Sequence, residues 1–214
     1  AVKILTKFSG NQALLSDLLQ KAIAADPLKE NKLKYYKLGI DMLEKANMYK
    51  EELKWYTDYS ALRGLKDEVY YYKMASIAVN AKDGNTAMSV SKEYIAAFPD
   101  KPQGYTLYVK GAKLVDTANS LGVVFEALNT QNQFLLKDVA KYKQSLVNNY
   151  YTIMAYYNEI KDFENAIAMC DKVLELIPAD PQTTKIKESL TKNWEIIKKM
   201  PGGQKPAVAE PKKD

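Results

Sequence analysis

The stretch that decides the fold is VYYYKMASIAVNAKDGNTAMSVSKEYIAAFPD, residues Val69 to Asp100. It contains two segments in which apolar or small residues recur every three to four positions, the spacing of one face of an α-helix. These residues are Tyr71, Met74, Ala75 and Ala78 in the first segment and Ala87, Val90, Ser91 and Tyr94 in the second. The polar stretch AKDGN (Ala81 to Asn85) separates them, and Pro99 follows the second because proline cannot continue a helix. The pattern predicts a helix, a turn and a second helix.

The first helical pattern occurs four times in the chain. Taking Tyr35, Tyr71, Tyr105 and Tyr150 as equivalent gives spacings of 36, 34 and 45 residues. Three, four and seven positions after them lie apolar or small residues: Leu38, Gly39, Met42; Met74, Ala75, Ala78; Tyr108, Val109, Ala112; Ile153, Met154, Tyr157. The second pattern also recurs, as Leu15, Leu18, Leu19 and Ala22 before Pro27 and as Ala166, Met169, Cys170 and Val173 before Pro178. An array of helix–turn–helix units is therefore expected.

This repeat resembles the tetratricopeptide repeat (TPR) family. Its unit of about 34 residues carries an aromatic residue, Leu-Gly and Tyr in the first helix and Ala, an aromatic residue and Pro in the second. The best copies are Glu68 to Lys101, with Tyr71, Ala75, Ala87 and Pro99 in the motif positions, and Val147 to Asp180, with Tyr150, Tyr157, Phe163, Ala166 and Pro178. The resemblance implies an all-α, right-handed superhelical solenoid of antiparallel helix pairs.

We expect a TPR-like solenoid over residues 1–200. It comprises a partial copy over 1–30, copies over 32–65, 68–101, 102–146 and 147–180, and a capping helix over 181–200. The copy over 32–65 departs from the pattern at Glu52, which stands in the alanine position, and at Gly64, which stands in place of proline. The copy over 102–146 is too long. We expect a helix from about Thr117 to Leu136, a break near Lys137 to Val139 and a long helix from about Ala140. The residues expected to face inward in the first of these helices are Leu121, Val124, Phe125 and Leu128.

The C-terminal part reads as a cap followed by a tail. Asp180 and Pro181 have the residue types preferred at an N-cap and at the first position of a helix. The apolar face of this helix consists of Ile186, Leu190, Trp194 and Ile197. Residues 201–214 contain three prolines and two glycines and almost no large apolar side chain. That composition predicts a disordered tail.

Composition excludes several kinds of partner. The 214 residues carry a net charge of +5, with 31 basic and 26 acidic residues interspersed. Nucleic-acid binding is not expected because it needs a concentrated basic stripe, and membrane insertion is not expected because no apolar run approaches about 20 residues. The chain begins with Ala1 rather than methionine, which favours a bacterial exported or periplasmic protein over a cytoplasmic one, or else a trimmed fragment. The oligomeric state is not predicted.

The residues do not support an enzyme. Histidine is absent, and with it the commonest general base and metal ligand. Cys170 is the single cysteine and lies in an inward helical stripe, where a buried structural thiol is expected. There is no phosphate-binding glycine loop and no metal-ligand spacing. We expect no catalytic residue, no metal and no cofactor.

The three consecutive tyrosines point to a binding surface. Adjacent residues on a helix point about 100° apart, so Tyr71 belongs to the packing stripe, Tyr70 pads an edge and Tyr72 begins another stripe. In the family that the chain resembles, this stripe of the first helices faces a concave groove. The residues implied for partner binding are Tyr36, Ile40, Tyr72, Ser76, Val79, Asn80, Lys110, Lys113, Tyr151 and Asn158. The alternative for each tyrosine is packing against the next repeat.

The resemblance implies a non-catalytic scaffold that binds an extended or helical segment of another protein in this groove through aromatic and apolar anchors. Two alternatives remain open. A cell-envelope module could bind a glycan or small molecule on the tyrosines, with Asn80, Asn158 and Glu159 as polar neighbours. A structural assembly subunit could instead use its convex face or the long helix near Phe134 to Tyr151.

Overall fold

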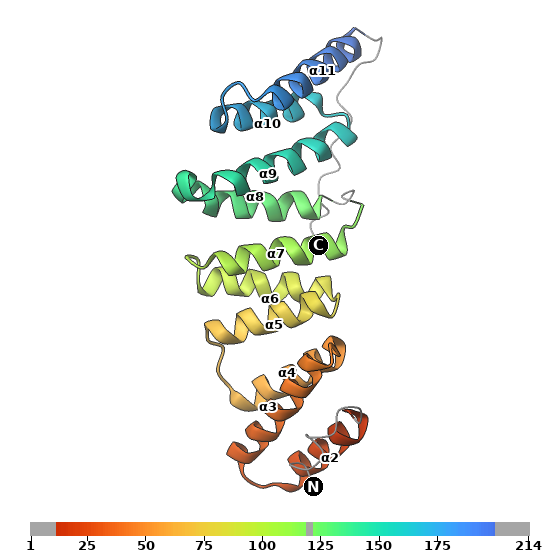
Figure 1. The fold of residues 1–214 in the computed structure, drawn as a ribbon, viewed down its shortest axis with the longest axis vertical. Helices are drawn as coiled ribbons and strands as arrows, with labels where there is room; N and C mark the ends of the chain where they lie inside the picture. The colour runs from red at the N-terminus through yellow and green to blue at the C-terminus, as the bar shows by residue number, and fades with distance from the viewer. Residues whose placement is uncertain (1–11, 119–121, 200–214) are drawn as a thin grey trace. The chain divides into compact units, whose positions relative to one another are not determined.

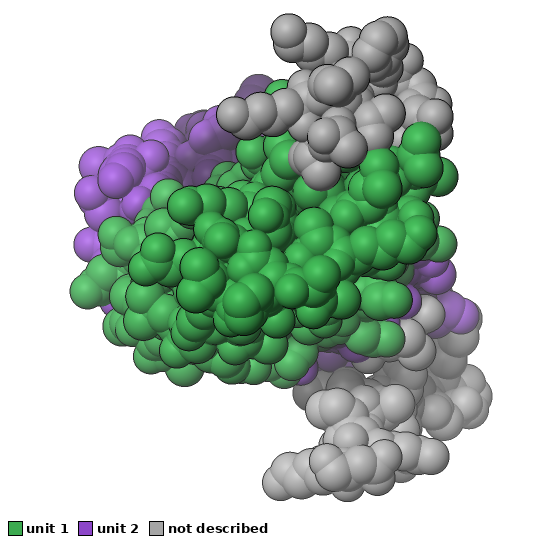
Figure 2. All heavy atoms as spheres, turned by 90° about the horizontal axis from the view of Figure 1, so that it is seen from below, with its two compact units in different colours: residues 1–114 green, residues 115–214 purple. Residues whose placement is uncertain are grey.

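The computed structural model describes residues 12–118 and 122–199, and all regular structure in these ranges is helical. Figure 1 labels the helices along the chain. The expected all-α class is confirmed. The chain divides into two compact units, residues 1–114 and 115–214, which Figure 2 shows in different colours. The boundary between them falls inside the copy predicted over residues 102–146.

The first unit is a series of helices that pack on their neighbours in the chain. They are α2 (Gln12–Ala25), α3 (Lys29–Lys45), α4 (Tyr49–Arg63), α5 (Glu68–Asn80), α6 (Gly84–Ala97) and α7 (Pro102–Val115). Contacts join α2 to α3, α3 to α4, α4 to α5 and α5 to α6. Helix α7 approaches α6 closely at Gly111, where a Cβ atom would lie 2.9 Å from the backbone nitrogen of Met88. Glycine at this position lets the two backbones meet.

The second unit contains α8 (Val123–Leu135), the short 3-10 helix η1 (Leu136–Asp138), α9 (Val139–Glu159), α10 (Phe163–Leu176) and α11 (Pro181–Lys198). Helix α9 packs on both α8 and α10, and α10 packs on α11. Leu190 of α11 is buried, and Ile186, Trp194 and Ile197 pack against the core that Cys170 and Phe163 of α10 help to form. Helix α11 therefore packs its predicted apolar face against α10.

The repeated stripes form the core. Ala75, Ala78, Ala87 and Ala166 are 0% exposed, because small residues are needed where helices cross closely. Tyr71 is 8% exposed and its ring stacks on that of Tyr94, while Phe98 meets both rings edge-on. The predicted packing role of Tyr71 is thus confirmed.

Proline ends the second helices as predicted. Helices α2, α6 and α10 end at Ala25, Ala97 and Leu176, each two residues before Pro27, Pro99 and Pro178. The residue before a proline is disfavoured in the helical region, which accounts for the common gap. Asp180 caps α11 as predicted, because its carboxylate accepts the N–H of Thr183 at 2.8 Å.

The turn AKDGN differs from its prediction, since Gly84 and Asn85 already belong to α6. The left-handed residue of this turn is Lys82, with φ of 63°. Asp83 follows and caps α6 by accepting the N–H of Thr86 at 3.0 Å. Lys161 and Asp162 repeat the arrangement before α10. The turn therefore depends on the aspartate cap and not on glycine.

The helix expected from Thr117 begins only at Val123, so that prediction is wrong. Gly122 precedes it with φ of 73°, a left-handed conformation that interrupts a helix and that glycine adopts without strain. Further along, η1 occupies the predicted break, and the 21-residue α9 agrees with the predicted long helix. The copy expected from Lys32 begins earlier, because α3 starts at Lys29. Leu121 and the predicted tail over 201–214 lie outside the described residues.

Within the described ranges, no helix combines the length and the apolar character that crossing a membrane requires.

Candidate functional site

Three neighbouring hollows lie on one side of the first unit, and they share residues of α5. The first hollow, of about 370 Å³, lies among α3, α4 and α5. The middle hollow, of about 390 Å³, shares Val69 and Lys73 with it. The third hollow, of about 270 Å³, lies between α5 and α7 and shares Tyr72 and Gln103 with the middle one. We call the surface formed by these three hollows the α5 face.

Tyr72 stands between the middle and third hollows and is 44% exposed. Tyr71, the residue before it, is buried, and Tyr70 meets the ring of Tyr71 edge-on at 5.0 Å. Val69, which borders the first and middle hollows, is 61% exposed. An aromatic and an aliphatic side chain are therefore presented side by side along α5 without being used by the core.

The structure brings three of the predicted binding residues together in the third hollow: Tyr72, Ser76 and Lys110. Leu107, which is buried, and the exposed Thr106 also line it. Ile40 lies in the first hollow instead. Val79 packs half-buried against the core, whereas Asn80 and Lys113 are exposed near the C-terminal ends of α5 and α7.

Tyr36 is engaged in packing. Its ring meets that of Trp55 edge-on, with centroids 5.8 Å apart and planes at 77°. Burial raises the pKa of Tyr36, and the Asp58 carboxylate raises it further. The side chain thus contributes to the contact between α3 and α4.

Tyr151 and Asn158 belong to the second unit. The Tyr151 hydroxyl donates to the Asp180 carboxylate at 3.2 Å and also contacts the hydroxyl of Thr183, a residue that is 0% exposed. Tyr151 therefore ties α9 to the capped start of α11. Asn158 is exposed in the last turn of α9.

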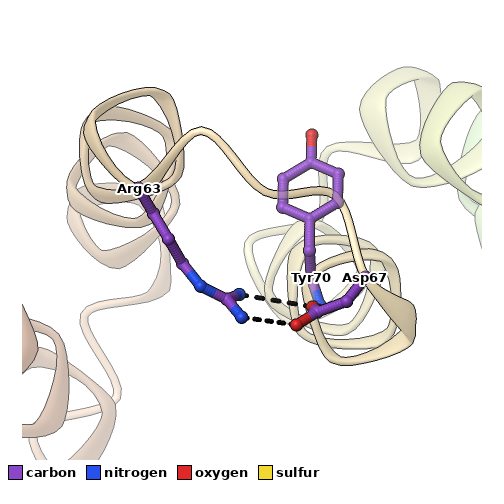
Figure 3. Close-up of polar contacts among 3 residues, drawn as sticks. All are labelled: Arg63, Asp67 and Tyr70. Carbon is purple, nitrogen blue, oxygen red and sulfur yellow. Dashed lines mark hydrogen bonds and ion pairs between the residues drawn. The ribbon is translucent and has the colours of Figure 1, made fainter.

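An ion pair fixes the start of α5. Arg63, at the end of α4, donates from both of its terminal nitrogens to the two carboxylate oxygens of Asp67 (Figure 3). Asp67 also accepts the N–H of Tyr70 at 2.9 Å and so caps α5. The Arg63 guanidinium lowers the pKa of Asp67, and the Asp67 carboxylate raises that of Arg63. A bidentate ion pair and an N-cap therefore fix the first turn of α5, the helix from which Val69 and Tyr72 project.

The middle hollow has its own matched charges. The Glu68 carboxylate bonds Lys101 at 2.8 Å and accepts the hydroxyl of Tyr94 at 3.2 Å. Hydrogen bonding to Lys101 lowers the pKa of Glu68, while burial raises the pKa of Tyr94 to about 12. Glu68 is thus ionised at neutral pH and its charge is already balanced.

Sequence analysis did not predict Glu52 as a site residue. The signal that could have found it is the presence of a glutamate in the alanine position of the repeat. Glu52 is 1% exposed, and its Oε2 atom has no hydrogen-bond partner. Burial raises the pKa of Glu52 to about 7, and the Glu44 carboxylate adds to the shift. The described ranges contain no cluster of three or more cysteine, aspartate or glutamate side chains suited to a metal ion.

The comparisons with known proteins identify the fold of the chain but no close relative in sequence. No protein-family model matches the chain. No curated protein matches it either. Among solved structures, it is similar to the C-terminal part of a TPR repeat-containing protein from Cytophaga hutchinsonii, with a TM-score of 0.59, 19% identity, and coverage of 86% of this chain and 69% of that one.

Two further solved structures resemble the chain more distantly. One is YrrB, described as a TPR protein with an unusual peptide-binding site, with a TM-score of 0.48, 14% identity, and coverage of 83% of this chain and 88% of that one. The other is MamA from Desulfovibrio magneticus RS-1, with a TM-score of 0.46, 16% identity, and coverage of 81% and 99%. The Cytophaga protein and the helix–turn–helix repeats together show that the chain has the TPR fold, an all-α helical-repeat solenoid.

Proposed function

We propose that this protein is a non-catalytic scaffold that binds a segment of a partner protein along the α5 face. The proposal rests on the exposure of Tyr72. This residue is 44% exposed and lines both the middle and the third hollow. Tyrosine offers a large contact area and a hydroxyl while losing little conformational entropy on binding. A ring with hollows on both sides can contact a segment that runs across it.

The surroundings of Tyr72 suit a protein ligand. Leu107 provides a buried apolar surface in the third hollow, and Ser76, Thr106 and Lys110 provide polar groups around it. An aromatic anchor with polar groups at its rim is the usual anatomy of a protein interface. Val69 extends the apolar part toward the first hollow.

The residues also favour binding over catalysis. The chain has no histidine. Cys170 is 0% exposed, and burial raises the pKa of its thiol, so the reactive thiolate is disfavoured.

The test is capture of a partner from a lysate, followed by affinity measurement with the purified partner. Tyr72→Ala is expected to weaken binding by about tenfold or more, the loss typical of a central aromatic anchor. Leu65→Ala is the matched control, because Leu65 is 52% exposed in the same unit and lies in the α4–α5 connection. Loss of binding with Leu65→Ala but not with Tyr72→Ala would place the partner elsewhere.

A second candidate function, assembly through the α8–α9 connection, has its own observation. Leu136 is 50% exposed and Val139 is 37% exposed, one on each side of Lys137 and Asp138. Leu136 lies in η1 and Val139 begins the 21-residue α9, so two exposed apolar side chains stand where α8 connects to α9. Replacing both with serine should leave the partner bound if the α5 face is the site and should release it if assembly uses α9.

A further inference from the structure

We propose that the third hollow, between α5 and α7, receives an acidic side chain of the partner segment, an aspartate or a glutamate, with its carboxylate beside Lys110 and Ser76. The inference rests on the proposed function, because the acidic residue belongs to the segment that contacts Tyr72. It states which kind of segment the α5 face prefers, namely one with an acidic residue close to an apolar one.

Two helices supply the walls of this hollow. Tyr72 and Ser76 lie one turn apart on α5, and Thr106 and Lys110 lie one turn apart on α7, so each pair projects from one face of its helix. All four residues line the third hollow. Tyr72 and Thr106 occupy the same position in successive repeats, 34 residues apart, and so do Ser76 and Lys110. The hollow therefore has Tyr72 and Thr106 at one end and Ser76 and Lys110 at the other.

The Tyr72 end of the hollow suits an apolar side chain. Tyr72 is 44% exposed there, and Leu107 and Pro102 line the same hollow. The Thr106 hydroxyl already donates to the backbone carbonyl of Pro102 at 3.1 Å. Its hydrogen is thus used within α7, and the aromatic and aliphatic surface is what this end offers to a ligand.

The other end of the hollow is positively charged. Lys110 is exposed and is the one charged residue among the described residues that line it. In the described part of the chain, neither the Lys110 ammonium nor the Ser76 hydroxyl has a hydrogen-bond or ion-pair partner. The ammonium has three hydrogens to donate and the hydroxyl has one. An ionised carboxylate only accepts hydrogen bonds, so it complements both groups.

The positive charge belongs to this hollow and not to the whole α5 face. The first hollow is lined by Asp41 and Glu44, and the middle hollow is lined by Glu68. No acidic residue is among the described residues that line the third hollow. Helix α7 adds to this difference, because its only charged residues are Lys110 and Lys113. An acidic ligand group is therefore matched at the third hollow, whereas the other two already contain carboxylates.

A carboxylate fits the charged end better than a phosphate group. A phosphate monoester carries nearly two negative charges at neutral pH and is bound best by clusters of arginine. The described lining of the third hollow contains one lysine and no arginine. A group with a single negative charge balances a single ammonium.

The length of the hollow sets how far the acidic residue lies from the apolar one. The four residues from Tyr72 to Ser76 advance about 6 Å along α5. Neighbouring residues of an extended segment are about 3.4 Å apart, and residues two positions apart are separated by about 7 Å. The acidic residue should therefore stand one or two positions from the residue that contacts Tyr72.

The experiment is an NMR titration of the ¹⁵N-labelled full chain with the peptide acetyl-Leu-Gly-Glu-amide and with its glutamine and phosphoserine analogues. Blocking both ends leaves the glutamate side chain as the only carboxylate. The glutamate peptide should shift the backbone amides of α5 and α7 around the third hollow. It should bind about two- to fivefold more tightly than the glutamine peptide, as expected for one exposed ion pair. Added salt should reduce this preference.

Two variants test the residues that hold the carboxylate. Lys110→Met removes the charge and keeps much of the side chain, so it should abolish the preference for the glutamate peptide. Ser76→Ala should reduce that preference. Lys54→Met is the matched control, because Lys54 is exposed on α4, lies outside the three hollows and gives the same change in net charge. The control should keep the preference.

Several results would overturn the proposal. They are equal affinity for the glutamate and glutamine peptides, an unchanged preference in the Lys110→Met chain, the same loss in the Lys54→Met chain, and tighter binding of the phosphoserine peptide. Absence of any amide shift with the glutamate peptide would do the same. The comparison of the three peptides on the wild-type chain needs no variant, so it does not depend on how a variant folds.

The failure of this inference differs from failure of the proposed function. If the glutamate peptide is not preferred but Tyr72→Ala still weakens the partner, only the acidic subsite is wrong. If the glutamate peptide is preferred and Tyr72→Ala leaves the partner unaffected, the subsite stands and the proposed binding of the partner along the α5 face is wrong.

Discussion

The rings of Tyr71 and Tyr94 stack with their centroids 5.9 Å apart and their planes 12° apart, so that α5 and α6 are joined by a buried aromatic pair. Tyr94 is 1% exposed and Tyr71 is 8% exposed. The next residue along α5, Tyr72, is 44% exposed. Adjacent tyrosines in one helix thus have opposite roles, one in the core and one at the surface.

Replacement of Tyr71 by alanine should destabilise the protein by about 3 to 5 kcal/mol, because a buried aromatic side chain is lost and a cavity remains. Tyr72→Ala should cost less than about 1 kcal/mol, as expected for an exposed side chain. Urea denaturation followed by circular dichroism measures both. A loss below about 1 kcal/mol for Tyr71→Ala would contradict the assigned helix register.

Replacement of Gly111 by alanine should destabilise the α6–α7 contact. The new Cβ atom would lie 2.9 Å from the Met88 nitrogen, which is backbone and cannot turn away. Overpacking of this kind costs about 1 to 3 kcal/mol, against a gain of about 1 kcal/mol in helix propensity. Lys113→Ala is the control on the exposed side of α7, and urea denaturation should show it to be nearly neutral. A more stable Gly111→Ala chain would disprove the close approach.

Stability should fall as the pH rises from about 5 to about 8. Glu52 has a pKa raised from 4.5 to about 7 in the folded protein. Between these values the folded state keeps a proton that the unfolded state releases, so the free energy of unfolding decreases with rising pH. At about 1.4 kcal/mol per pKa unit, the full effect approaches about 3 kcal/mol.

Glu52→Gln should remove most of this pH dependence, because glutamine does not titrate, while Glu51→Gln should keep it. Urea denaturation at several pH values measures the slope. The same slope in wild type and in the Glu52→Gln chain would show that Glu52 is not the titrating group.

Replacement of Tyr36 by leucine should affect stability and not binding. The edge-on pair with Trp55 contributes about 0.5 to 1.5 kcal/mol beyond the area buried. The partner affinity of this variant should equal that of wild type, in contrast to Tyr72→Ala. Weaker binding of the partner with unchanged stability would show that Tyr36 belongs to the binding surface.

Much of the fold follows from local patterns. Helical spacing and prolines predict the repeats, the ends of α2, α6 and α10, and the cap at Asp180, because each depends on residues close in sequence. The start of α8 was predicted too early because Gly122 takes a left-handed conformation, which the amino-acid sequence alone does not reveal. A glycine within an apolar run is compatible with either a helix or its interruption.

The candidate site was less predictable because it depends on distant contacts. Tyr151 and Tyr72 occupy the same position of the repeat, yet the Tyr151 hydroxyl bonds Asp180 and Thr183 on a helix about thirty residues away. Glu52 departs from the repeat pattern, but only the packing of α3, α4 and α5 shows that its carboxyl is buried without a partner. Repeat position thus gives the direction of a side chain and not its neighbours.

Site-specific photocrosslinking tests the central claim most directly. A benzophenone amino acid placed at position 72 should crosslink the partner protein, and the same group placed at position 65 should not. Mass spectrometry of the crosslinked peptide would then identify the bound segment. Crosslinking from position 65 or from position 139 of α9, with none from position 72, would contradict the account.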